Sequence, residues 1–445
     1  MIRKTKKQPK ANDFIKEYTY RFRIYPNAEQ IAFFKEQIGH NRFVYNFFLE
    51  RSEHLHKDYG VKYSYSDMQR VIPLLKKGFP FLKDVNSQSL QGALLNLDNA
   101  YKRFFNHESD HPVFKSKKKL NAISIPQNFK FIDDKLYIPK VKSPIKVKFH
   151  RKVNETVKSI SISVTSTGKY YVNMSVEKVF IPKDKTNIVS GIDLGIKTLA
   201  TVITGISKTD NETFKIENPK YYIDSQKQII KLSRQLSKKK HPRYKGDRTP
   251  KSKNYVKLSK RLALLYERQT NQIIDYAHKK SFAIINDSQV IVAEDLNIKG
   301  MLKNKRLSKA IQNAAWSRFL RQIEYKADFY GRDFRKVGRF YPSSKSCSTP
   351  NCGYIYKDLK LSERFWICPE CNTLHDRDEN ASYNLFLQGL GRLSSEPINI
   401  TIGQVSPEFT PAEIAIADDP VIPATEHTLK SNLSMKQESP SERAG

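Results

Sequence analysis

The chain has 445 residues, enough for two to four domains with hydrophobic cores of their own. Its 78 lysine and arginine residues outnumber its 45 acidic residues, and the formal net charge of +33 indicates a polyanionic partner, because neutralised phosphates release their counterions. No apolar run approaches the ~20 residues of a membrane-spanning helix, and residues 1–10 lack the apolar core of a secretion signal, so we expect an intracellular protein without a membrane partner.

The N-terminal part of the chain predicts a small β-barrel that carries a helical insertion. Residues 1–12 are basic and are expected to form a disordered arm. Residues 18–25 have the alternation of a strand and end at a Pro-Asn pair, so the strand is followed by a turn. A helical block at about 27–107 comes next, with helices expected at 29–38, 41–53 and 87–105. Further strands, which complete a lobe at 13–183, are expected at 122–125, 136–138, 145–149, 159–165 and 170–176.

At residue 188 the pattern changes to the βββαβα order of an RNase H-like sheet. Strands are expected at 188–189, 198–205, 213–216 and 290–293, and a long helical pair at about 224–286. Within that pair, the segment 238–253 is rich in proline, glycine and positive charge, so it is expected to be a loop, either a solvated linker or a contact for nucleic acid. A helix at about 308–330 and a strand near 335–340 complete this part, which we place at 184–342.

Three acids occur where these strands end or a helix begins. Asp193 and Glu294 end short apolar runs, and Asp378 opens an apolar-periodic helix at 375–392. Carboxylates are the ligands of hard divalent cations, and two such cations about 3.5–4 Å apart clamp the attacking and leaving oxygens of a phosphoryl displacement. Each acid alone is equally compatible with an ordinary solvated group. Their order along the chain, strand, strand and helix, favours a two-metal site.

The four cysteines lie between residues 343 and 374, which we expect to form a zinc ribbon. Cys347 and Cys352 form a C-x4-C pair and Cys368 and Cys371 a C-x2-C pair, separated by fifteen residues. Four thiolates at such spacings can surround Zn²⁺ in a closed structural site. A redox dithiol would explain only the second pair. His375 is an alternative ligand, although we expect it beside the acids instead. Residues 393–445 are rich in proline and serine and are expected to be mostly disordered.

Several motifs in this order resemble the TnpB family, the transposon-encoded relatives of the type V CRISPR effectors, over nearly all of residues 18–412. The motifs that carry the resemblance are Tyr20–Pro26, Asn41–Asn46, Phe114–Lys118, Ile123–Gln127, Gly191–Ala200, Val292–Asn297, Ser343–Cys347, Cys368–Cys371, Asp376–Ala381 and Pro407–Pro411. One departure is the first cysteine pair, since the family usually has C-x2-C there; four intervening residues still permit zinc ligation in a looser turn.

The resemblance implies a multidomain α/β protein. Its parts would be a wedge β-barrel with an inserted helical recognition domain, then a split RuvC (RNase H-like) domain with an inserted zinc ribbon. It further implies a prokaryotic, cytoplasmic RNA-guided endonuclease that acts at the nucleoid, binds a guide RNA from the transposon end, and cleaves double-stranded DNA beside a short adjacent motif. Asp193, Glu294 and Asp378 would be its catalytic acids on Mg²⁺ or Mn²⁺, with Asp376 the fallback for the third, and Zn²⁺ would be structural.

Reading of the adjacent motif is expected from the helical block. Tyr45, Gln88 and Gln91 are the candidates, because glutamine can pair bidentately with adenine in the major groove; the alternative is that these glutamines simply face water. Three other functions also compete. They are a non-catalytic, zinc-containing, nucleic-acid-binding regulator of transposition, which would not need the three acids; a sugar-kinase or actin-like ATPase, which would need a second glycine-rich loop; and a DNA transposase.

Overall fold

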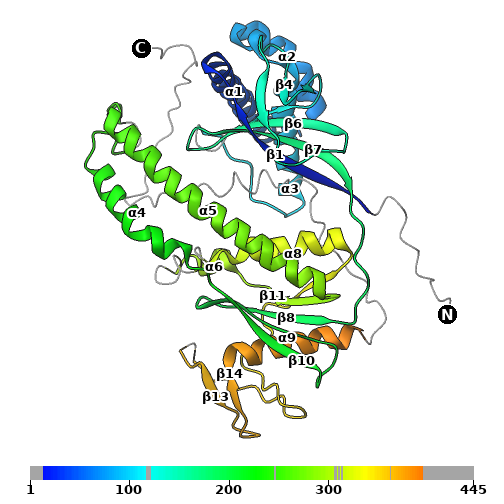
Figure 1. Cartoon of the computed structure of the whole chain (residues 1–445). Helices are drawn as coiled ribbons and strands as arrows, with labels where there is room; N and C mark the ends of the chain where they lie inside the picture. The colour runs from blue at the N-terminus through cyan, green and yellow to red at the C-terminus, as the bar shows by residue number, and fades with distance from the viewer. Residues whose placement is uncertain are drawn as a thin grey trace, which may run out of the picture. The chain divides into compact units, whose positions relative to one another are not determined.

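The computed structural model describes residues 14–116, 122–244, 247–304, 308, 311, 314–360 and 362–393 (Figure 1). The basic arm at 1–12 and nearly all of the tail at 393–445 lie outside the described residues. The chain divides into two compact units, here called the N-terminal unit (residues 17–178) and the C-terminal unit (residues 179–393, together with residues 14–16).

The N-terminal unit contains an open seven-stranded sheet. Its strands, in the spatial order β2-β6-β7-β1-β5-β4-β3, are Ala122–Ile125, Val157–Val164, Tyr170–Val179, Ile15–Tyr25, Ile145–Lys148, Lys135–Tyr137 and Lys130–Ile132. The strand order ends at β2 and β3, so the described sheet is a half-barrel and not the small barrel that we predicted. Closure needs long, tilted strands, whereas β3 and β4 have three residues each. β3 was not predicted from the sequence.

The helices of this unit are α1 (Ala28–Tyr59), α2 (Tyr65–Gly78), the short 3₁₀ helix η2 (Pro80–Asp84) and α3 (Ser87–Phe105). α1 begins in a capping box, in which Asn27 and Gln30 each accept a hydrogen bond from the other's backbone N–H. The two helices predicted at 29–38 and 41–53 are one, because the residues between them keep the helical conformation. α2 was not predicted; it packs on α1 and α3 through the apolar residues Phe48, Leu49, Met68, Leu90, Leu94 and Leu97.

The C-terminal unit has the predicted RNase H-like strand order. Its five-stranded sheet β10-β9-β8-β11-β12 consists of Asn211–Glu217, Thr198–Gly205, Val189–Leu194, Val290–Glu294 and Asp333–Val337. The hairpins β8–β9 and β9–β10 are antiparallel, whereas β8, β11 and β12 run parallel to one another. Parallel neighbours end at the same edge of a sheet, so this topology brings together chain segments that are about 100 residues apart.

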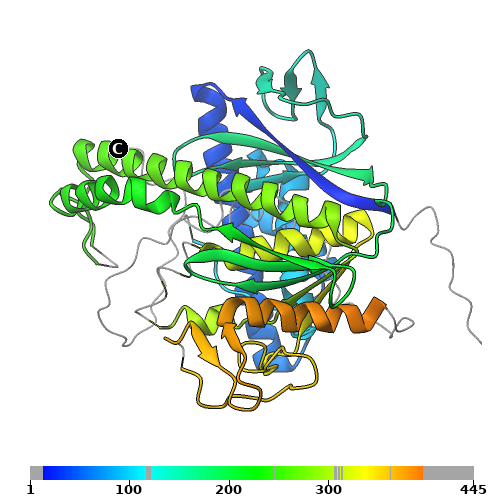
Figure 2. The same ribbon diagram turned by 60° about the horizontal axis from the view of Figure 1, so that its bottom comes forward.

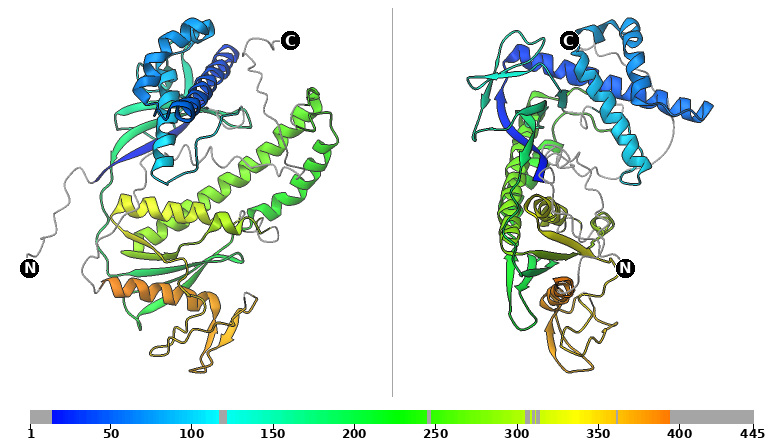
Figure 3. Two further views of the ribbon diagram at one scale, coloured as in Figure 1. Left: turned by 180° about the vertical axis from the view of Figure 1, so that it is seen from behind. Right: turned by 90° about the vertical axis from the view of Figure 1, so that its right-hand side faces the viewer.

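Helices cover both faces of this sheet (Figures 1, 2 and 3). α5 (Lys253–Asp287) and α8 (Trp316–Tyr330) pack on one face, and α9 (Arg377–Leu393) packs on the other. α4 (Tyr221–Ser237) precedes α5, and the short α6 (Ile298–Met301) follows β11. α8 begins later than the predicted helix at 308–330, because Ala315 has a φ of 53° and interrupts the helix. No described helix is long and apolar enough to cross a membrane.

Candidate active site and cysteine cluster

The three predicted acids lie at one edge of the sheet in the C-terminal unit. Ala293 of β11 pairs with Ile192 of β8. The next residues of these strands, Glu294 and Asp193, therefore lie side by side where the two strands end. Asp378 is in the first turn of α9, which packs across β8. The three acids are therefore brought together from two strands and a helix, as the order of the motifs predicted.

Gly191 explains how α9 comes so close to β8. A Cβ at this position would lie 2.3 Å from the carbonyl oxygen of Ser382 and 2.3 Å from the amide nitrogen of Phe386, both in the backbone of α9. Any residue but glycine would push the helix away. This glycine thus sets the distance between the helix that carries Asp378 and the strand that carries Asp193.

The acids share one electrostatic environment. Burial raises the pKa of Asp193 well above its ordinary value, and repulsion from the carboxylates of Glu294 and Asp378 raises it further, against the opposing effect of Arg377. Burial also raises the pKa of Glu294, while the hydroxyl of Ser343 and the charge of Arg377 oppose the shift. Crowded, partly buried acids of this kind are stabilised in their charged form by cations.

Two neighbours of the acids were not predicted. The Ser343 hydroxyl donates a hydrogen bond to Oε1 of Glu294. Arg364 donates from Nη2 to Oδ2 of Asp378 over 2.8 Å. Ser343 begins the motif Ser343–Cys347, which marks it as a candidate for function, although its partner is known only from the fold. Arg364 lies between the cysteine pairs with no distinctive spacing, and only the folded ribbon brings it to Asp378.

Asp376 and Asp378 have different surroundings. Oδ1 of Asp376 accepts hydrogen bonds from the backbone nitrogens of Asp378 (2.9 Å) and Glu379 (3.3 Å), which is the arrangement of a helix N-cap. The other oxygen of Asp376 lies 3.8 Å from Nζ of Lys215. Asp376 thus caps α9, whereas the Asp378 carboxylate is the one that acts electrostatically on Asp193.

The four cysteines converge in the ribbon formed around β13 (Phe365–Ile367) and β14 (Leu374–Asp376). Their sulfur atoms all lie within 4.8 Å of one another, and the pairs Cys347–Cys371 and Cys352–Cys368 are each 3.6 Å apart. A tetrahedral zinc site with Zn–S bonds of about 2.3 Å has sulfur–sulfur edges of about 3.8 Å. The described cysteines therefore match the donor set and the size of such a site. Among the described residues the three carboxylates do not form an equally tight group.

His375 lies against this cluster and not where we expected it. Its Nε2 is 3.1 Å from Sγ of Cys347, and its ring packs on Trp366 with a centroid distance of 4.7 Å. Alternation along β14 explains the placement, since neighbouring side chains of a strand point to opposite faces. His375 therefore faces the ribbon core while Asp376 turns towards α9.

The candidates for motif reading lie in the helices of the N-terminal unit. Tyr45 of α1 is only 3% exposed and burial raises its pKa to about 12, so its hydroxyl does not face solvent. Gln91 of α3 is exposed and Gln88 is half-buried, and the two are three residues apart on one side of the helix. The structure thus groups the two glutamines and leaves Tyr45 in the core.

Three protein-family models match the chain. A model described as "Probable transposase" matches residues 169–305, a "Cas12f1-like, TNB domain" matches 316–385, and a "Helix-turn-helix domain" matches 17–60. The last match falls on β1 and the single helix α1 in this structure. The first two together span the acidic site and the cysteine cluster.

Proteins of two bacteria and of a virus are similar to this chain. A protein of Streptomyces pristinaespiralis named "Putative RNA-guided DNA endonuclease" is 32% identical over 377 residues, which cover 83% of this chain and 89% of the relative. A protein of Escherichia coli K12 named "Putative RNA-guided DNA endonuclease InsQ" is 28% identical over 391 residues, covering 83% and 92%. A "TnpB-like protein L79" of Acanthamoeba polyphaga mimivirus is 29% identical over 252 residues, covering 52% and 44%.

A solved structure is similar to this chain over most of its length. The cryo-electron microscopy structure of a Cas12f1–sgRNA–target DNA complex superposes with a TM-score of 0.50 and 17% sequence identity, and the match covers 81% of this chain and 83% of that chain. At this level of identity the likeness concerns the fold.

Proposed function

The chain is a member of the TnpB family, and from this premise we propose that it is the RNA-guided DNA endonuclease of a transposon. The observation that carries the proposal is the gathering of Asp193, Glu294 and Asp378 at one edge of an RNase H-like sheet. A protein that only binds nucleic acid has no need to bury repelling carboxylates. The reaction would be hydrolysis of a phosphodiester in double-stranded DNA next to a short adjacent motif.

The acids would hold Mg²⁺, or Mn²⁺, through carboxylate oxygens. When bound, two such ions would supply an activated water and charge to stabilise the leaving 3′-oxygen. Ser343 orients Glu294 by donating to one of its oxygens, which leaves the other oxygen for a ligand. Arg364 brings a guanidinium to Asp378, where it can also bind a phosphate oxygen and offset negative charge that develops there.

The cysteine cluster would hold structural Zn²⁺. Four sulfur donors and no open position match a closed site, which stabilises a fold and does not activate water. The ribbon has a small apolar core around Trp366 and Leu359, too small to order its loops alone. Arg364 belongs to this ribbon, so zinc would indirectly hold one residue of the active site in place.

Guide RNA and target DNA account for the charge of the chain. A net charge of +33 suits a protein that covers a long polyanion. In guided nucleases, base pairing supplies most of the sequence information while the protein recognises a short motif and the shape of the duplex. Gln88 and Gln91 remain our candidates for that recognition, since they lie on one side of α3.

The test begins with expression of the chain together with its native flanking DNA. Co-purified RNA is sequenced, and cleavage of a matched target in a library of adjacent motifs is measured with Mg²⁺, beside an Asp193→Ala control. Cleavage that needs RNA, metal and Asp193 is the expected result. RNA binding without cleavage across the library would instead favour the non-catalytic regulator of transposition.

A further inference from the structure

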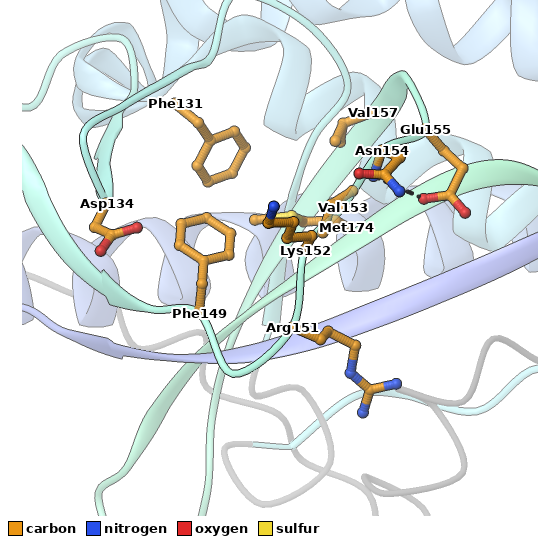
Figure 4. Close-up of a pocket in the computed structure, with 10 residues that line it drawn as sticks. All are labelled: Phe131, Asp134, Phe149, Arg151, Lys152, Val153, Asn154, Glu155, Val157 and Met174. Carbon is orange, nitrogen blue, oxygen red and sulfur yellow. Dashed lines mark hydrogen bonds between the residues drawn. The ribbon is translucent and has the colours of Figure 1, made fainter.

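A pocket of about 600 Å³ opens on the N-terminal unit (Figure 4). Its walls come from the β3–β4 hairpin, the segment between β5 and β6, and the strands β6 and β7. Phe131 and Phe149 line one side, and buried Met174 lies at the bottom. The exposed residues Arg151, Lys152 and Asn154 complete the lining, and the Arg151 guanidinium extends from its edge towards His150 and the ring of Tyr20. The volume lies within the ~300–1,000 Å³ range of sites for small organic groups.

The apolar side of the pocket is aromatic and held in place. The rings of Phe131 and Phe149 lie 6.0 Å apart at 74°, and both side chains are only partly buried. Phe149 also packs on Phe22, a fully buried residue of the sheet, at 4.8 Å. A flat ring that entered the pocket would therefore meet preorganised π-faces.

The surroundings of the pocket attract phosphate. Residues 130–158 contain nine lysine and arginine residues and three acids, a formal excess of +6. Arg151 and Lys152 are exposed, and in the described part of the chain no ion pair joins either to an acid. Two of the three acids, Asp134 and Glu155, line the pocket. The Glu155 carboxylate already accepts hydrogen bonds from the hydroxyl of Tyr20.

We propose that this pocket binds one unstacked base of a single-stranded nucleic-acid segment, whose phosphates lie on Arg151 and Lys152. Aromatic faces and a cationic rim are the means by which proteins hold such bases, and Asn154 can bond to a base edge. The proposal rests on the proposed function, which supplies two sources of single strand, the guide RNA and the displaced DNA strand.

The test uses the full chain, freed of nucleic acid, and fluorescence anisotropy. The probes are fluorescein-labelled octamers of uridine RNA, thymidine DNA and an abasic sugar-phosphate chain. Phe131→Leu is expected to weaken binding of a base-containing octamer about tenfold, within the effect of one lost stacking contact, and to leave the abasic octamer unchanged within about twofold. Phe131→Tyr, which keeps the ring, is expected to restore binding.

Matched controls separate stacking from folding and charge. Tyr137→Leu removes an exposed ring from the neighbouring strand, and Lys148→Ala removes a charge from the same surface; neither residue lines the pocket. If Phe131→Leu weakens binding of the uridine octamer alone, the site is assigned to RNA. If it weakens binding of both the uridine and the thymidine octamers, the site accepts RNA or single-stranded DNA. Equal weakening of base-containing and abasic probes, or no weakening, overturns the proposal. Target cleavage is measured separately, so loss of either property leaves the other standing.

Two buried asparagines of α9 carry a second, independent inference. Nδ2 of Asn384 donates to the carbonyl oxygens of Ser343 (2.8 Å) and Ser346 (2.7 Å). Nδ2 of Asn380 donates to the same two carbonyls (3.3 and 2.7 Å), and its Oδ1 accepts from the backbone nitrogen of Ser348 (3.0 Å). Both side chains are under 5% exposed. The segment 343–348 is thus fastened to the helix that carries Asp378.

We infer that Asn384 is a positioning residue for Glu294 and acts through Ser343. The Ser343 backbone is held by the asparagines while its hydroxyl donates to Glu294, so α9 aligns an acid on β11 that it does not itself carry. This inference also rests on the proposed function. Asn384→Leu keeps the volume of the side chain and removes both hydrogen bonds. Gln388→Leu is the control, because it removes an exposed amide one turn further along α9 that donates to the hydroxyl of Tyr341, outside the segment 343–348.

Two measurements test this role. Amide hydrogen exchange in 343–348 should rise in Asn384→Leu and not in Gln388→Leu, whether or not the chain cleaves DNA. In cleavage, Ser343→Ala and Asn384→Leu should each slow the rate about tenfold and show no further loss when combined, because both remove the same contact to Glu294. Additive losses would mean that Asn384 only stabilises the fold.

Discussion

Asp376 and Asp378 lie two residues apart. Replacing Asp376 by asparagine is expected to leave the cleavage rate nearly unchanged, whereas replacing Asp378 is expected to lower it strongly. Asn accepts hydrogen bonds at a helix N-cap about as well as Asp, so Asp376→Asn should keep both bonds to the backbone of α9. The ion pairs of Asp376 with Lys215 (3.8 Å) and Arg364 (3.9 Å) are long and contribute little. We therefore expect cleavage within about threefold of wild type, since the catalytic carboxylates remain.

Asp376→Ala measures the cap itself. Loss of an N-cap costs about 1 kcal/mol, and for a unit of roughly 200 residues this corresponds to about 2–4 °C in Tm. Asp378→Asn, by contrast, should lower the cleavage rate and leave the stability nearly unchanged. It removes a ligand, for which a loss of at least about 100-fold in rate is expected because even the partners of ligands are worth 10–100-fold. Its stability should change by less than about 1 kcal/mol, since the partly exposed pair with Arg364 is weak and repulsion of Asp193 is relieved.

The assay is single-turnover cleavage with Mg²⁺, together with thermal unfolding of each variant. Loss of cleavage in Asp376→Asn, with cleavage kept in Asp378→Asn, would refute the assignment of the third acid. Loss in both would show that the cap and the ligand are not separate roles.

Three further predictions concern pH, zinc and packing. Because folding raises the pKa of Asp193, the charged carboxylate destabilises the metal-free protein above that pKa, and this cost disappears as the pH falls towards the pKa of the unfolded chain. Asp193→Asn should therefore have a higher Tm than wild type in the presence of a chelator, and the difference should shrink at lower pH. A difference in Tm that does not change with pH would contradict this. Elemental analysis should find one zinc ion per wild-type chain and none in Cys368→Ser, whereas retained zinc would point to other ligands. Gly191→Ala should destabilise the chain by about 1–3 kcal/mol through its clash with α9, as measured by chemical denaturation. Gly39→Ala, in α1 with nothing within 4 Å of the new Cβ, should stabilise it by about 0.5–1 kcal/mol.

The strands of the C-terminal unit could be predicted closely. β9 occupies the predicted residues 198–205, and the apolar run at 290–293 is β11 without its final acid. Both strands are buried on two faces over most of their length, so β11 is an unbroken apolar run and β9 is interrupted only by threonines, which favour strands. β12, by contrast, was predicted two residues late, since a partly exposed strand at the sheet edge carries a weaker pattern.

The N-terminal unit was harder to predict. α2 contains Pro73 and is only 14 residues long, and its helical state depends on packing against α1 and α3. β3 is three residues long, which is too short to show the alternation of polar and apolar residues by which a strand is predicted. Whether the sheet closes depends on contacts between strands distant in the chain, which no local pattern reports.

The residue types of the two sites and their order along the chain follow from the sequence alone, because a metal site requires particular donor atoms whatever fold presents them. The contacts between residues far apart in the chain, and thus the role of each, follow only from the tertiary structure. It made Asp376 the cap of α9, placed Arg364 of the ribbon on Asp378, turned His375 to the cysteines, and joined Ser343 to Glu294. Each of these contacts depends on the close approach of separate elements, and the register of β8 with β11 and the absence of a side chain at Gly191 set that approach.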